Sequence, residues 1–158
     1  MLLYHSLFAT YLQYGVVCWG TAKSTAMSKI KTLQNKVIRH ITLSGRMENV
    51  DKFYKTLGIL KVEDIHFLEV AKFMYKNTKQ TLPHTFSEYY RPIPHHHDTR
   101  AKTKNILSIP KSRTNFGKQS IKFTGVKVWS EVPNATKQCR NLDSFSCQVK
   151  EFLLGKYS

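Results

Sequence analysis

Residues 62–78, Val-Glu-Asp-Ile-His-Phe-Leu-Glu-Val-Ala-Lys-Phe-Met-Tyr-Lys-Asn-Thr, decide the fold class of this chain. A helix formed by this stretch would be apolar over most of its circumference, and such a helix normally lies at the centre of a core. The adjacent acids Glu63 and Asp64 stand where a helix N-terminus favours negative charge. The stretch therefore predicts a central helix in a mainly α-helical protein. The side chains that would fill the core are Ile65, Phe67, Leu68, Val70, Ala71, Phe73 and Met74.

The preceding part of the chain also has helical periodicity. Residues 24–43 repeat apolar side chains at three- and four-residue intervals, with Ser24 as a plausible N-cap and Gly45 as a plausible terminator. A second helix is predicted over residues 49–56, ending at Gly58. The apolar face of the first helix comprises Met27, Ile30, Leu33, Val37, Ile38 and Ile41. Its other faces carry Lys29, Lys31, Lys36 and Arg39, which suit either a solvated face or a surface that meets phosphates.

The composition changes after residue 90. Prolines at positions 83, 92 and 94 exclude a long helix there, and nine Lys or Arg residues face the single acid Asp98 between Arg91 and Lys127. Residues 106–109 and 120–124 have the short β-branched character of strands. Leu142, Phe145, Val149, Phe152 and Leu153 form one face of a final amphipathic helix. We therefore predict a helical bundle over residues 1–90, followed by a basic, loop-rich α+β domain over residues 91–158 with short strands and a C-terminal helix.

The charge of the chain points to an anionic partner. Among its 158 residues, 25 are Lys or Arg and 10 are Asp or Glu, a net charge of +15. The basic residues are spread along the chain, which favours nucleic acid over a membrane surface. No apolar run approaches the length of a membrane span, and the N-terminus lacks the basic start of a secretory signal. Three cysteines without close pairing suit a reducing compartment, so we expect an intracellular protein.

No autonomous active site is recognisable in the sequence. His95, His96 and His97 are consecutive, so their side chains diverge and a polar loop is a better interpretation than a zinc site. No phosphate-binding loop or nucleophile elbow occurs, and the ten acids are mostly isolated. We expect no metal, no cofactor and no catalysis by this chain alone. A free-standing enzyme that uses the histidine cluster is the competing hypothesis.

Residues 112–133 interleave cations with aromatic rings. Arg113, Lys118 and Lys122 are the predicted phosphate contacts of this stretch. Its rings, Phe116, Phe123 and Trp129, are candidates either for stacking on unpaired bases or for packing in a core. The apolar surroundings of Trp129 favour packing for that residue.

Several short motifs, in order and spacing, resemble the region beyond the polymerase palm in reverse transcriptases of non-LTR retrotransposons, most closely the jockey-like LINE group. The resemblance covers nearly the whole chain. It is carried by Tyr14-Gly15, Trp19-Gly20, Leu33-Gln34-x-Lys36-Val37-Ile38-Arg39, Leu57-Gly58-Ile59-Leu60, Phe73-Met74-Tyr75-Lys76, Thr99-Arg100, Arg113-Thr114-Asn115-x-Gly117-Lys118-x-Ser120-Ile121, Gly125-x-Lys127-x-Trp129, Val132-Pro133 and Leu142-x-Ser144-Phe145. His97-Asp98 stand where the family has an aromatic residue and Asn.

The resemblance implies a thumb-like helical segment followed by the C-terminal domain of an RNA-directed DNA polymerase. The carboxylates of the palm motif Y/F-x-D-D are not in this chain, so the resemblance implies binding without polymerisation. RNA or an RNA–DNA hybrid is the expected partner, held by non-specific phosphate contacts from Lys36, Arg39, Arg100, Arg113, Lys118 and Lys122. The alternative is a degenerate retroelement remnant with only a structural or interaction role.

Overall fold

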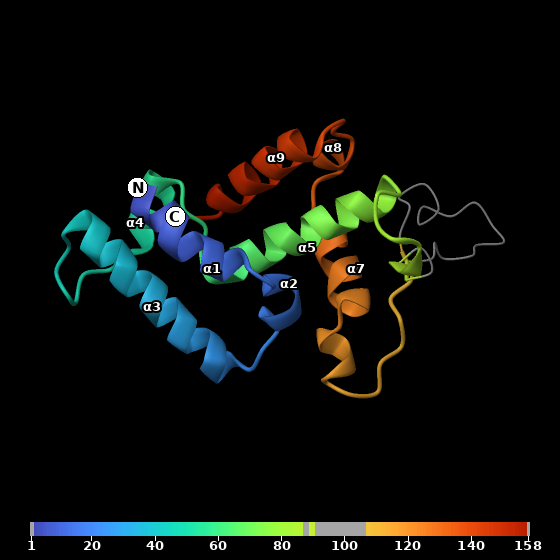
Figure 1. Ribbon diagram of the computed structural model, residues 1–158, viewed down its shortest axis with the longest axis horizontal. Coiled ribbons are helices and arrows are strands. Elements are labelled where there is room, and N and C mark those ends of the chain that lie inside the picture. The colour runs from blue at the N-terminus through green and yellow to red at the C-terminus, as the bar shows by residue number, and fades with distance from the viewer. Residues whose placement is uncertain (1, 87–88, 91–106, 158) are drawn as a thin grey trace. The chain divides into compact units, whose positions relative to one another are not determined.

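The computed structural model describes residues 2–86, 89–90 and 107–157. The protein is mainly α-helical, as the sequence predicted (Figure 1). Its elements are the π-helix η1 (Tyr4–Ala9), α1 (Thr10–Gln13), α2 (Val16–Trp19), α3 (Ser24–Thr42), α4 (Asp51–Leu57), α5 (Val62–Thr78), the 3-10 helices η2 (His84–Phe86) and η3 (Gly117–Gln119), α7 (Ile121–Glu131), α8 (Asn134–Lys137) and α9 (Leu142–Leu154).

The chain forms two compact units. Met1–Glu69 and Ser146–Ser158 make the first unit, and Val70–Phe145 makes the second. The boundaries fall inside α5 and α9, and the C-terminal residues pack with the N-terminal ones. The division into 1–90 and 91–158 followed the change in composition, whereas these units follow contacts between residues.

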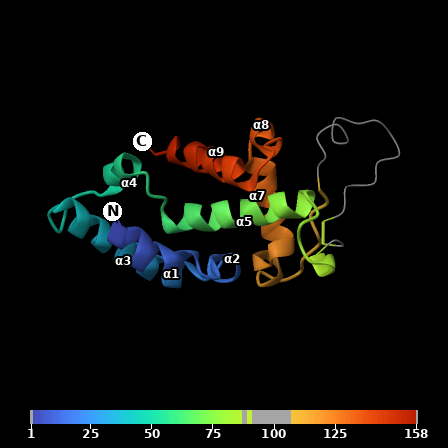
Figure 2. The ribbon, with the colours of Figure 1, turned by 45° about the horizontal axis from the view of Figure 1, so that its top comes forward.

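Gln34 organises the first unit. Its side chain is fully buried in α3, and its Nε2 donates to the Tyr4 hydroxyl at 3.0 Å and to the Leu60 carbonyl at 2.8 Å. Its Oε1 accepts the Val62 backbone N–H at 3.0 Å. The amide thus links α3 to η1 and to the start of α5, and η1 and α1 run beside α3 (Figure 2). Leu33, expected on the buried face, is 53% exposed, whereas the neighbouring Gln34 is fully buried.

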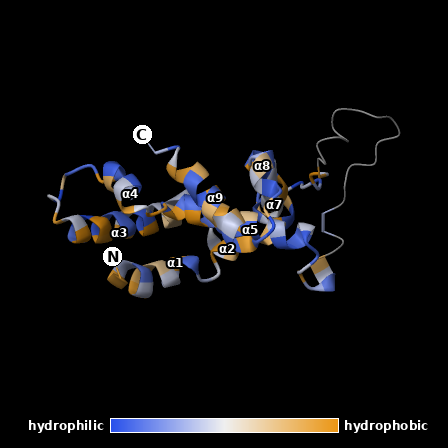
Figure 3. Cartoon of the chain, turned by 90° about the horizontal axis from the view of Figure 1, so that it is seen from above, coloured by the Kyte–Doolittle hydropathy of each residue, from blue (hydrophilic) through white to orange (hydrophobic). Residues whose placement is uncertain are grey.

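The C-terminus closes the same unit. The Tyr157 hydroxyl accepts the Lys61 backbone N–H at 2.9 Å and donates to the Asp64 carboxylate. Burial raises the pKa of Tyr157, and its hydrogen bond to Asp64 acts in the same direction. The predicted apolar face of α9 is confirmed, since Phe145, Val149 and Leu153 are buried. Figure 3 shows the mixture of hydrophilic and hydrophobic residues along α3 and α9 that such two-faced helices have.

The second unit is built around the C-terminal half of α5. Met74, Tyr90 and Val126 form its buried cluster, and the Tyr90 hydroxyl donates to the Ile121 carbonyl at 2.8 Å. A Cβ at Gly125 would lie 2.6 Å from the Tyr90 hydroxyl oxygen and 2.8 Å from the Met74 sulfur. Gly125 therefore permits the close approach of α7 to these side chains.

The predicted strand at residues 120–124 is wrong. Ser120 is extended, but helix α7 begins at Ile121 and buries Val126 and Val128. A five-residue alternation does not distinguish strand from helix, and packing against Tyr90 decides it. Of the other predicted strand, residues 107–109 are described: Leu107 makes an isolated bridge, and the next two residues have no regular structure. No strand forms within the described ranges.

Candidate nucleic-acid interface

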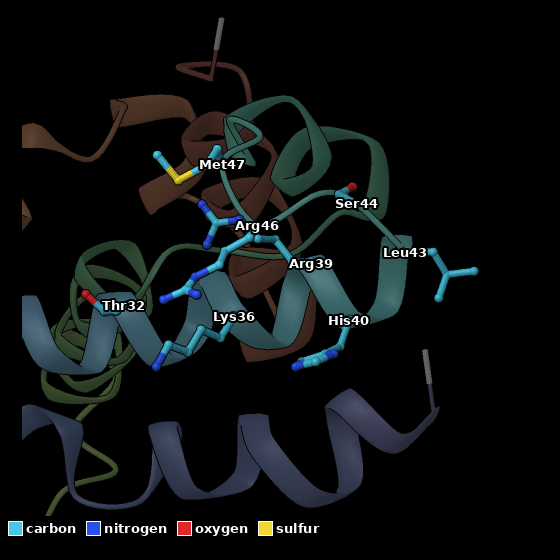
Figure 4. Close-up of a pocket in the computed structure, with 8 residues that line it drawn as sticks. All are labelled: Thr32, Lys36, Arg39, His40, Leu43, Ser44, Arg46 and Met47. Carbon is cyan, nitrogen blue, oxygen red and sulfur yellow. The ribbon is translucent and has the colours of Figure 1, made fainter.

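A pocket of about 650 Å³ lies at the C-terminal end of α3, within the first unit (Figure 4). Four of its lining residues come from α3 and four from the turn that follows. They are Thr32, Lys36, Arg39 and His40, and then Leu43, Ser44, Arg46 and Met47. Because positions 32, 36, 39 and 40 recur at helical intervals, one face of α3 forms one wall of the pocket.

Arg39 holds the turn against the helix. Its Nε and Nη2 both donate to the Glu48 carbonyl, at 3.3 and 3.1 Å. Its own carbonyl accepts the N–H groups of Leu43 and Ser44, the latter at 3.0 Å. The Thr42 and Ser44 hydroxyls share a hydrogen bond of 2.7 Å. These bonds fix the direction in which the turn leaves α3, and Arg46 of this turn lines the same pocket as Lys36.

The lining is cationic, and no acidic side chain among the described residues lines it. The nearest carboxylate in sequence is that of Glu48, which forms an ion pair with Lys52 at 2.7 Å. The hydrogen bond from Lys52 lowers the pKa of Glu48 and keeps this carboxylate ionised. Asp51 is likewise paired with Lys61 at 2.7 Å, and the hydrogen bond from Lys61 lowers the pKa of Asp51. The Glu48 carboxylate also hydrogen-bonds Ser44, a pocket-lining residue, so this acid lies at the edge of the pocket. Glu48 and Asp51 are paired with Lys52 and Lys61, which leaves the charges of Lys36, Arg39 and Arg46 available to an anion.

The structure brings two of the six predicted contact residues, Lys36 and Arg39, into this pocket. Arg100 lies outside the described residues. Arg113, Lys118 and Lys122 belong to the second unit and are exposed there. The Lys122 ammonium lies 3.9 Å from the centroid of the Tyr89 ring.

The turn before α7 presents Phe116 to solvent. The Ser112 hydroxyl donates to the Thr114 carbonyl at 3.0 Å, and the Gly117 N–H donates to the Thr114 hydroxyl at 3.1 Å. A Cβ at Gly117 would meet the Ser112 hydroxyl, which would then have to move away from its place in the turn. Phe116 is 84% exposed between Arg113 and Lys118. Of the three rings proposed for stacking, this one is free of packing contacts with the core.

Trp129 packs inside the second unit, as its apolar surroundings favoured. Its ring lies 6.1 Å from that of Phe145, which in turn stacks on Tyr75 at 4.5 Å. Lys137 lies over the Trp129 ring at 5.4 Å, and Lys127 over the Phe123 ring at 4.9 Å. Both rings therefore already have cations of this chain as partners.

No group of three potential metal ligands occurs in the part of the chain that the structure describes. His95, His96 and His97 lie outside it. Cys18, Cys139 and Cys147 are free thiols. Within the described ranges, none of the helices has the length and apolar character needed to span a bilayer.

Sequence reasoning missed six of the lining residues, which are Thr32, His40, Leu43, Ser44, Arg46 and Met47. His40 and Arg46 lie near the predicted contacts in the sequence, and their basic side chains could have indicated that they belong to the same site. Leu43 and Met47 carried no signal, because isolated apolar residues near a helix end are ordinary. No protein-family model, curated protein or solved structure matches the chain.

Proposed function

We propose that this chain is a non-catalytic C-terminal segment of the reverse transcriptase of a non-LTR retrotransposon, which binds RNA or an RNA–DNA template–primer. The observation that carries the binding proposal is the pocket at the end of α3, where Lys36, Arg39 and Arg46 gather with His40. A phosphate backbone is the anion best suited to such a cluster, because each neutralised phosphate releases counterions and adds affinity.

The parent family is proposed from the ordered motifs of the sequence, and several motif residues have defined roles in the fold. In the first motif, Gly15 adopts a φ of 61°, and the Trp19 indole donates to the Tyr14 carbonyl at 2.8 Å. In the next, Gln34 makes the buried hydrogen bonds of the first unit, while Lys36 and Arg39 line the pocket. This motif on α3 thus contains both Gln34, whose buried hydrogen bonds hold the first unit together, and the cations of the pocket.

Arg113 and Lys118 are proposed as additional phosphate contacts from the second unit. Both are exposed and flank Phe116 on a turn of defined geometry. The Lys122 ammonium lies over the Tyr89 ring, and reaching a phosphate would require it to leave that ring.

The proposal is tested by fluorescence anisotropy with an RNA–DNA hybrid over a series of salt concentrations. Lys36→Ala combined with Arg46→Ala removes two phosphate contacts, so the slope of log affinity against log salt becomes less negative by about 1.4–1.8. The matched control, Lys29→Ala with Lys55→Ala, removes the same charge from exposed positions outside the pocket lining. We expect the control to keep most of the wild-type slope.

Two results would contradict binding through this pocket. One is an affinity that does not change with salt, and the other is an equal loss of slope in both double variants. If no nucleic acid binds at low salt while thermal unfolding is cooperative, the alternative of a remnant with only a structural role stands.

A further inference from the structure

Leu43 combines two unfavourable properties at the edge of the pocket. Its backbone is left-handed, with φ 52° and ψ 31°, a region that side chains other than glycine rarely adopt. Its apolar side chain is 93% exposed, so no burial offsets this conformation. Leucine at this position therefore does not help the isolated chain to fold.

The end of α4 shows what folding alone favours. There the left-handed residue is Gly58, with φ 63°, and the Ile59 N–H bonds the Tyr54 carbonyl at 2.9 Å. The end of α3 has the same pattern, in which the Ser44 N–H bonds the Arg39 carbonyl at 3.0 Å. This hydrogen-bonded ending usually takes glycine. Gln80 also adopts a positive φ, but its polar side chain is suited to the exposure it has there.

A second exposed apolar side chain lies at the other end of the same group. Met47 is 93% exposed, and Figure 4 shows it near the guanidinium groups of the arginines, with Leu43 at the opposite end of the group. Leu43 and Met47 line the pocket together with the cations Lys36, Arg39 and Arg46. A phosphate alone, or the phosphate surface of a duplex, has no group that matches those two side chains.

We infer that this pocket takes single-stranded nucleic acid, with Leu43 and Met47 contacting unpaired bases on either side of a phosphate held by Lys36 and Arg46. The inference rests on the proposed function and adds the strand state of the ligand. Unpaired bases offer the apolar faces that pairing and stacking hide in a duplex. The hollow of about 650 Å³ distinguishes the site from a flat basic surface suited to lipid headgroups.

The test compares an oligonucleotide of about twelve nucleotides with the same strand carrying abasic sites, because the two share every phosphate. Wild-type protein is expected to bind the intact strand about fivefold more tightly, and a duplex more weakly than the intact strand. Leu43→Gly should remove most of the preference for the intact strand and leave binding of the abasic strand unchanged. The melting temperature of this variant should equal or exceed that of the wild type, because glycine relieves the left-handed backbone.

Leu33→Ala is the matched control, since Leu33 is an exposed leucine of α3 that does not line the pocket. It should leave both affinities unchanged. Equal binding of intact and abasic strands by the wild type would overturn the inference while leaving phosphate binding in place. Failure to bind any oligonucleotide at low salt would remove the proposed function as well. Binding of phosphatidylserine vesicles that Leu43→Gly abolishes, with oligonucleotide binding unaffected, would assign Leu43 to a lipid surface and overturn the inference.

Discussion

Two regions of the molecule are rich in cations: the pocket at the end of α3 and the segment from Ser112 to Pro133. They differ in what their cations contact. In the segment, the ammonium groups of Lys122 and Lys127 lie over rings of the same unit, at 3.9 and 4.9 Å. In the pocket, Lys36 and Arg46 line a recess to which no Phe, Tyr or Trp among the described residues contributes. The segment whose sequence most resembles a nucleic-acid site thus places two of its lysines on aromatic rings of the protein itself.

This difference shows that interleaved cations and rings are an ambiguous signal. A lysine beside an aromatic residue packs its stem on the ring and keeps its charge in water, which stabilises the fold without any ligand. A cluster of cations without such partners, where the nearby acids are already paired, has no equivalent internal role. The second arrangement is therefore the stronger indication of an anionic ligand.

The largest expected effect comes from Trp129→Ala. The ring packs against Phe145 and the buried cluster of the second unit, so its loss should lower the free energy of unfolding by about 2–4 kcal/mol. Thermal or urea unfolding followed by circular dichroism measures this. Affinity for RNA should change by less than about twofold when measured well below the melting temperature, because the ring serves packing.

Phe116→Ala is the control for that comparison. Phe116 is 84% exposed, so its removal should change stability by no more than about 0.5 kcal/mol. The distinction between the two regions breaks down if Trp129→Ala leaves stability intact and weakens binding, since Trp129 would then be a stacking platform.

The sequence predicted the helices better than it predicted the site. The limits of α5 were found because its apolar content and the acids at its start agree with each other. The end of α3 was found to within one residue, but its terminating residue was not, because Leu43 adopts the left-handed conformation that was expected of Gly45. Ser24 was expected as the N-cap; Lys23 occupies that position, and Ser24 begins the helix.

The site depends on contacts that no local pattern encodes. Lys36 and Arg39 were found from their spacing on one helix. Arg46 enters the pocket because the Arg39 side chain binds the Glu48 carbonyl and folds the turn back. That contact joins a charged side chain to a backbone group nine residues away, and backbone groups leave no mark in the sequence.

A second prediction measures the two regions on the same scale. Lys118→Ala with Lys122→Ala should make the salt slope less negative by about 0.7–0.9, half the change expected for the pocket pair. The reason is that Lys118 is exposed, whereas the Lys122 ammonium is engaged over the Tyr89 ring. Anisotropy titrations at the same salt concentrations give both slopes. A change of slope as large as that of Lys36→Ala with Arg46→Ala would mean that the two regions contribute equally to phosphate binding.

The smallest expected effect is a pH dependence confined to the first unit. The Nε2 of His66 is buried there without a hydrogen-bond partner among the described residues, and burial lowers the pKa of this imidazole. In the unfolded chain the imidazole titrates near its ordinary pKa of about 6.5. Below that pH the unfolded state binds more protons than the folded state, so the stability of the first unit should fall as the pH falls through 6.5 toward the lowered value.

The two tryptophans report this separately, because Trp19 lies in the first unit and Trp129 in the second. In a Trp129→Phe background, the midpoint of unfolding followed by Trp19 fluorescence should decrease between pH 7.5 and pH 5.5. Adding His66→Gln should reduce that decrease, since glutamine does not titrate. In a Trp19→Phe background, the midpoint followed by Trp129 should change less over the same range. Equal changes in both backgrounds would mean that the two units unfold as one. A decrease that His66→Gln leaves unchanged would mean that protonation of His66 is not the cause.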